Sequence, residues 1–164
     1  GGRRGGVMAT WAEFESEAAE LAGEVRAAFE RHKHLVLGTL RRDGSPRLSG
    51  TEVTFGEGEL WLGMMPRSMK GRDLHRDARY SIHSAPLDVT MANGDAKVSG
   101  VVSEVVDDGE RAAFWSMQGY DGAPIEALLF RCDVSEASLA TVDGDHMVVD
   151  AWRAGEAPWQ VIPD

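Results

Sequence analysis

The chain has 164 residues and a formal net charge of −10, with 27 Asp and Glu against 17 Lys and Arg. Its hydrophobic content of 43% is that of an ordinary globular protein, and no apolar run approaches the roughly 20 residues of a membrane span. The acidic balance argues against general nucleic-acid binding, which relies on excess Lys and Arg, so we expect neither a nucleic-acid nor a membrane partner.

The length of the chain predicts a single domain, which we place at residues 10–155 between a flexible tail at 1–9 and a C-terminal tail at 156–164. The one cysteine, Cys132, rules out an internal disulfide and is typical of a protein in the reducing cytoplasm. Because Cys132 lies in an apolar stretch, we expect it in the core.

The first predicted element is a helix that begins at Thr10. Thr10 and Glu13 match the T-x-x-E capping box, in which each side chain bonds the backbone amide of the other residue. Apolar residues then recur at spacings of three and four, which predicts one buried stripe along a single helix. The basic run "RHKH" at 31–34 suits a helix C-terminus. The stripe consists of Trp11, Phe14, Ala18, Leu21, Val25 and Phe29.

Three strands are expected next. The apolar run at 35–40 is typical of a buried strand, and the alternation at 47–55 is typical of a half-buried one. An Asp-Gly turn at 41–46 joins these two, and a turn at 56–59 leads into the third strand at 60–64. The three strands predict a meander.

The remainder of the chain mixes helices and strands. A short helix is expected with Ser68 as its N-cap, and a second one at 107–120. One long strand is expected to be bulged near Gly100, and the chain after Gly155 is expected to be irregular. With six or more antiparallel strands, an N-terminal helix and short helices between strands, the natural architecture is a small closed barrel. These later strands are predicted at 79–85, 96–106, 126–134, 137–142 and 146–153.

Positive charge gathers in the stretch "MPRSMKGRDLHRDAR" at 65–79, which carries five Lys or Arg against two Asp. If Ser68 begins a helix, the free amides at the helix start, the Ser68 hydroxyl and the Lys70 ammonium form a binding site for a phosphate. The alternative is a solvated basic helix that pairs with its own Asp73 and Asp77. The residues alone leave both interpretations open.

The sequence indicates no other familiar chemistry. The five histidines are scattered, with no H-E-x-x-H motif, and we expect no metal site. The G-x-S-x-G motif of hydrolases, the G-x-G-x-x-G motif of dinucleotide folds and the Walker loop are all absent. Four short motifs do follow one another in a fixed order: DGSP at 43–46, LWLG at 60–63, SMK at 68–70 with Leu74, and DAR at 77–79.

This order of motifs resembles that of the pyridoxamine 5′-phosphate oxidase-like family, the flavin-binding split β-barrels. The resemblance is strongest at 34–84, and with the order of elements it extends over 35–155. The segment "WRAGEAPW" at 152–159 is similar, more loosely, to the tail of some deazaflavin-using relatives.

The resemblance implies a homodimer with FMN, or a related flavin, in a cleft between the subunits. It places the cofactor phosphate at Arg47, Ser68 and Lys70. Arg67 would stand in for the arginine that the family often carries at the position of Met69. The flavin ring is expected along Leu48, Ser49, Gly50, Gly63 and Met64.

The chain departs from the pyridoxamine phosphate oxidases at Glu52, where those enzymes carry a second lysine, and a carboxylate there would disfavour a phosphate. We expect an FMN-binding oxidoreductase with an unnamed substrate and no identified catalytic acid or base, since the flavin supplies the chemistry. Three alternatives remain: a deazaflavin (coenzyme F-420)-dependent reductase, a non-catalytic flavin- or heme-binding protein, and a dimeric barrel that has lost its cofactor. Trp61, Trp115 and Trp152 are candidates either for the cleft wall or for the core.

Overall fold

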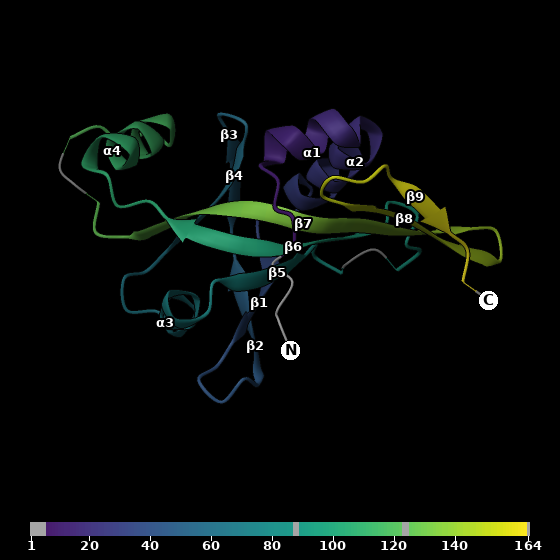
Figure 1. The fold of residues 1–164 in the computed structure, drawn as a ribbon, viewed down its shortest axis with the longest axis horizontal. Coiled ribbons are helices and arrows are strands. Elements are labelled where there is room, and N and C mark those ends of the chain that lie inside the picture. Colours follow the sequence, from purple (N-terminus) through teal and green to yellow (C-terminus); the bar gives the residue numbers. More distant parts are fainter. Residues whose placement is uncertain (1–5, 87–88, 123–124, 164) are drawn as a thin grey trace.

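The computed structural model describes residues 6–86, 89–122 and 125–163, and within these residues the chain forms nine strands and four helices. The long central strands cross the middle of the molecule, and the two N-terminal helices cover one side of them (Figure 1). No helix in the described part of the chain is long and apolar enough to cross a membrane.

The predicted N-terminal helix is two helices, α1 (Trp11–Glu17) and α2 (Ala19–Glu30), because Ala18 leaves the helical region at φ −147°. The prediction of one continuous helix was therefore wrong. The capping box is present as predicted: the amide of Glu13 donates to Thr10 Oγ1 at 3.1 Å and the amide of Thr10 to Glu13 Oε1 at 3.2 Å. All six residues of the predicted apolar stripe are buried.

The first hairpin consists of β1 (Leu35–Leu40) and β2 (Pro46–Thr51), and the second of β3 (Val53–Gly56) and β4 (Glu59–Met64). The strand predicted at 47–55 is interrupted at Glu52, since β2 pairs with β1 whereas β3 pairs with β4.

Three further strands, β5 (Arg79–His83), β6 (Asp95–Glu104) and β7 (Leu128–Asp143), complete a path in the order β2-β1-β5-β6-β7-β4-β3. The two ends of this path, β2 and β3, follow one another in the chain across Glu52 alone. Every pairing along this path is antiparallel, as expected for the predicted barrel-like architecture.

The pairing of β6 with β7 contains the bulge predicted near Gly100. The register shifts between Ser99 and Gly100, and Ser135 is the extra residue on β7. The Ser135 hydroxyl donates to Ser99 O at 3.0 Å and its carbonyl accepts from the amide of Ala154, so β7 runs on through the bulge. The two strands predicted at 126–134 and 137–142 are for this reason one strand.

The end of the chain also differs from expectation. β8 (His146–Arg153) has the predicted bounds, but the segment predicted to be irregular contains a ninth strand, β9 (Trp159–Val161), which pairs with β8. At the other end, Ala9 exchanges two backbone hydrogen bonds with Val134, so Ala9 joins the sheet although we had placed it in the tail.

Two apolar cores hold these elements together. The larger lies between α1, α2 and the sheet; it includes Cys132, as predicted, and a stacked pair of Phe14 and Trp152 whose ring centroids are 4.3 Å apart. The smaller lies under α4 (Asp108–Met117), a helix with Asp107 as its N-cap, and contains Trp61.

Candidate anion-binding site

The short helix α3 (Met69–Arg76) begins after Ser68, as predicted, and Ser68 Oγ accepts a hydrogen bond from the amide of Gly71 at 3.2 Å. The first amides of a helix have no acceptor within it, so the N–H groups of Met69 and Lys70 point outward from its start. A Cβ at Gly71 would lie 2.5 Å from Leu128 Cδ1 and 2.9 Å from Ser68 Oγ. Glycine therefore lets α3 pack closely on β7 while the cap stays in place.

Lys70 connects the start of α3 to β2. Its Nζ donates to the carbonyl oxygen of Gly50 at 2.8 Å. Burial lowers the pKa of the Lys70 ammonium, and the carboxylate of Glu52 works against that shift. The ammonium is thus held at the side of β2 on which Gly50 lies.

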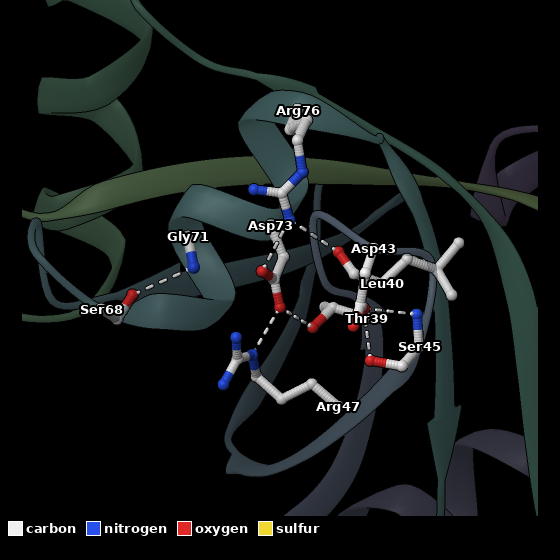
Figure 2. A network of polar contacts seen from close by, with 9 residues as sticks. All are labelled: Thr39, Leu40, Asp43, Ser45, Arg47, Ser68, Gly71, Asp73 and Arg76. Atoms are coloured by element: carbon white, nitrogen blue, oxygen red, sulfur yellow. Dashed lines mark hydrogen bonds and ion pairs between the residues drawn. The ribbon is translucent and has the colours of Figure 1, made fainter.

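A second connection between α3 and β2 centres on Asp73, whose side chain is only 2% exposed. Asp73 Oδ2 accepts from Arg47 Nε at 2.6 Å and from Thr39 Oγ1 at 2.8 Å, and Oδ1 accepts from Arg76 Nη2 at 3.0 Å (Figure 2). Burial works to raise the pKa of the Asp73 carboxyl, but the bonds from these three donors outweigh it and hold the pKa below its ordinary value.

The guanidinium of Arg47 donates to Asp73 through Nε, and its two terminal nitrogens take no part in that hydrogen bond. Figure 2 shows these nitrogens pointing away from Asp73, on the side of α3 where Ser68 lies. Arg47, Ser68, Lys70 and the first amides of α3 can all donate hydrogen bonds, and two of the groups are cationic. Such a set suits a phosphate or another oxyanion.

The other residues predicted to contact the phosphate or the ring are placed as follows. Arg67 is exposed, and the described part of the chain offers it no side-chain bond. On β2, Leu48 is 74% exposed and Ser49 is half-buried. Met64 is buried in the larger core, with its Sδ 3.5 Å from where a Cβ of Gly71 would stand, so its side chain supports α3.

Gly63 lies where β4 has passed the end of β3, since the β3–β4 pairing stops at Val53 and Leu62. A Cβ at Gly63 would lie 3.5 Å from Trp115 Cη2 of α4. Trp115 is half-buried and borders Gly63, whereas Trp61 and Trp152 are buried in the cores. The placement of the ring itself stays a prediction.

The carboxylate that we expected to disfavour a phosphate lies close to two side chains from the segment before β1. Glu52 Oε1 lies 3.7 Å from Lys33 Nζ and 3.3 Å from His34 Nε2. Three other basic residues of the 65–79 stretch are structural or solvated: Arg76 pairs with Asp73, Arg79 pairs with Asp77 at 2.7 Å, and Arg72 is exposed.

The role of Asp73 was not predicted from the sequence, where Asp73 was expected only as a partner within a solvated helix, and Thr39 was not among the predicted residues. The structure places Asp73 between Gly71 and Leu74, which are both buried, so a charged residue there needs partners inside the fold. Among the described residues, no group of three or more His, Cys, Asp or Glu is arranged to hold a metal ion.

Neither a model of a known protein family nor a curated protein matches this sequence. Solved structures do match. A pyridoxamine 5′-phosphate oxidase-related, FMN-binding protein from Nostoc punctiforme superimposes with a TM-score of 0.62 at 14% identity, over 92% of this chain and 96% of that one. The fold is that of the pyridoxamine 5′-phosphate oxidase-like split β-barrels.

Two further relatives show the breadth of this fold. PhzG from Burkholderia lata, solved in complex with tetrahydrophenazine-1-carboxylic acid, matches with a TM-score of 0.66 at 14% identity over 91% of this chain and 93% of its own. A heme-binding protein from Mycobacterium smegmatis matches with a TM-score of 0.58 at 21% identity over 90% of this chain and 59% of its own. At such identities the likeness concerns the split-barrel fold alone.

Proposed function

We propose that this protein binds FMN, with the phosphate held by Arg47, Ser68, Lys70 and the start of α3, and that it acts as an oxidoreductase. The observation that carries this proposal is the donor set itself, in which two cations and a capped helix start lie together beside β2. Two of the solved structures with this fold are described as FMN-binding or as a pyridoxamine phosphate oxidase, which supports the same choice.

When bound, FMN would supply hydride or electron transfer. The contribution of the chain is to bind and orient the group. Arg47 and Lys70 would neutralise the phosphate, and the outward amides of α3 would donate to it. Trp115, beside Gly63, would shield that side of the ring from water.

Two other ligands remain candidates. A deazaflavin such as coenzyme F-420 carries a phosphate on the same type of side chain, so the same donors would serve it. Heme is a second candidate, because a heme-binding protein shares the fold and because heme propionates are also oxyanions.

We further propose that the site is completed by a second copy of the chain. Three large apolar side chains beside the site are exposed: Leu48 by 74%, Met65 by 77% and Met69 by 51%. Exposed apolar side chains gathered at a binding site are typical of a surface that is covered in the assembly. Sedimentation velocity of the wild type and of Leu48→Glu tests this, with a dimer expected for the wild type and a weaker one for the variant.

Absorbance of the purified protein and titration with FMN and riboflavin test the cofactor assignment. Riboflavin lacks the phosphate, so the ratio of the two dissociation constants isolates the phosphate contribution. Loss of one charge-assisted hydrogen bond is worth about 1.5–3 kcal/mol, and we expect Lys70→Ala to weaken FMN binding by at least about tenfold while riboflavin changes little.

Arg72→Ala is the matched control, because Arg72 lies on the same helix but is exposed. Equal loss of both ligands in Lys70→Ala, or equal effects of the two variants, would contradict the assignment. A Soret band, or preferential binding of the deazaflavin, would redirect the proposal to those ligands. Turnover with a reduced nicotinamide as donor then distinguishes an enzyme from a carrier.

A further inference from the structure

Asp73 is a buried carboxylate that accepts from three side chains of different elements, Thr39 on β1, Arg47 on β2 and Arg76 on α3 itself. Burying a charge is unfavourable unless it is paired and hydrogen-bonded, and here both oxygens are used. A purely structural role for these hydrogen bonds would be to join β1, β2 and α3. The atoms through which each arginine is held indicate that Asp73 also orients the guanidinium of Arg47.

The two arginines use different atoms. Arg76 engages its terminal Nη2, which donates both to Asp73 Oδ1 and to the carbonyl oxygen of Leu40, each at 3.0 Å. Arg47 engages Nε, at 2.6 Å from Asp73 Oδ2. A guanidinium bound through Nε still has the N–H groups of both terminal nitrogens, and these can grip an oxyanion with two parallel bonds.

We propose that Asp73 is a positioning residue of the cofactor site: it holds Arg47 by Nε and thereby presents both terminal nitrogens of the guanidinium to the cofactor phosphate. The inference rests on the proposed function, namely that a phosphate-bearing flavin binds here. Figure 2 shows the geometry, with the Asp73 carboxylate above the Arg47 guanidinium and the two terminal nitrogens on the side of Ser68.

The physical benefit is pre-organisation. A free arginine side chain has many rotamers, and fixing one of them on binding weakens affinity. Arg47 has already lost that freedom in the protein without a ligand, because Asp73 is buried and cannot move away. A lysine at position 47 could not replace it, since a single ammonium must choose between the carboxylate and the phosphate.

The test is the ratio of the dissociation constants for riboflavin and FMN, measured by fluorescence titration. For Asp73→Asn we expect FMN affinity to fall by about tenfold, which corresponds to the loss of one charge-assisted hydrogen bond, while riboflavin affinity stays nearly unchanged. For Arg47→Lys, which keeps the charge and leaves the core intact, we expect a similar loss. Arg76→Gln removes another bond to Asp73 and is the matched control; it should lower stability and keep the ratio.

A double-mutant cycle separates positioning from a general structural effect. In the Arg47→Ala background, Asp73→Asn should not lower the ratio further, because the residue through which Asp73 acts is gone. The proposal is overturned if Asp73→Asn lowers the ratio equally in both backgrounds, or if Arg47→Lys retains the wild-type ratio. The second outcome decides the matter even if Asp73→Asn fails to fold.

The phosphate site and the positioning role of Asp73 are rejected by different results. If the wild type shows no preference for FMN over riboflavin, the phosphate site is wrong and the positioning role falls with it. If the wild type prefers FMN and either Asp73→Asn or Arg47→Lys keeps that preference in full, the phosphate site stands and only the positioning role of Asp73 is rejected.

Discussion

The bulge between β6 and β7 makes Gly100 the most restrictive glycine in the fold. A Cβ at Gly100 would overlap the carbonyl oxygen of Asp133 and lie 2.8 Å from its carbonyl carbon and 3.1 Å from Val134 Cα. All three are backbone atoms, so no rotamer change can relieve the overlap. Gly100→Ala must instead move one of the two central strands.

The size of the effect follows from this geometry. Extra methyl groups in well-packed cores cost about 1–3 kcal/mol when side chains can adjust, and here only the backbone can. We expect a loss of about 3 kcal/mol, a large part of a typical stability of about 5–15 kcal/mol. Alanine loses less backbone freedom on folding than glycine, which stabilises the variant by at most about 1 kcal/mol. This gain is too small to make the substitution stabilising.

Urea unfolding followed by tryptophan fluorescence measures the change, with Gly23→Ala as the control. At Gly23, on α2, a Cβ would meet no atom within 4 Å, so alanine should stabilise the helix by about 0.5–1 kcal/mol. Glycine-to-alanine substitution is thus expected to lower the free energy of unfolding at Gly100 and to raise it at Gly23. If Gly100→Ala unfolds at the wild-type urea concentration, the close approach of β6 and β7 is wrong.

Two further outcomes follow from the site. The pKa of Asp73 lies below its ordinary value, so the ionised carboxylate stabilises the fold fully above the unfolded-state pKa of about 3.9, and this stabilisation is lost as the pH falls through the folded-state pKa. Urea unfolding at a series of pH values should therefore show that the difference in unfolding free energy between wild type and Asp73→Asn shrinks toward acid pH. A difference that stays constant with pH would contradict this. Met69 is 51% exposed at the start of α3, and Met69→Arg should raise the preference for FMN over riboflavin several-fold, because any effect on the dimer applies to both ligands. An unchanged preference would show that the added charge does not meet the phosphate.

Local patterns predicted much of the fold. The capping box at Thr10, the N-cap at Ser68 and the bulge near Gly100 each depend on a few neighbouring residues, and all are present. The features that the sequence did not predict depend on contacts between residues that are far apart in the chain. The helix break at Ala18 lets Trp11 and the later stripe residues share one core, and nothing in the local spacing marks it.

The same division applies to the site. Arg47, Ser68 and Lys70 were named from motifs, and the contacts of β2 with α3 bring them into one region. Asp73 escaped notice because its importance lies in partners on two other elements, 26 and 34 positions away along the chain. A helical charge looks solvated until the sheet beneath it is known.

Cys132 has a consequence for how the molecule can be observed. Its side chain is fully buried where β7 pairs with β4, and burial raises the pKa of the thiol, so the reactive thiolate is scarce and out of reach. A thiol reagent in solution meets this sulfur only when the central strand parts from its neighbours. The rate at which Cys132 is modified therefore measures how often the sheet opens around β7. A ligand that stabilises the closed state would lower this rate.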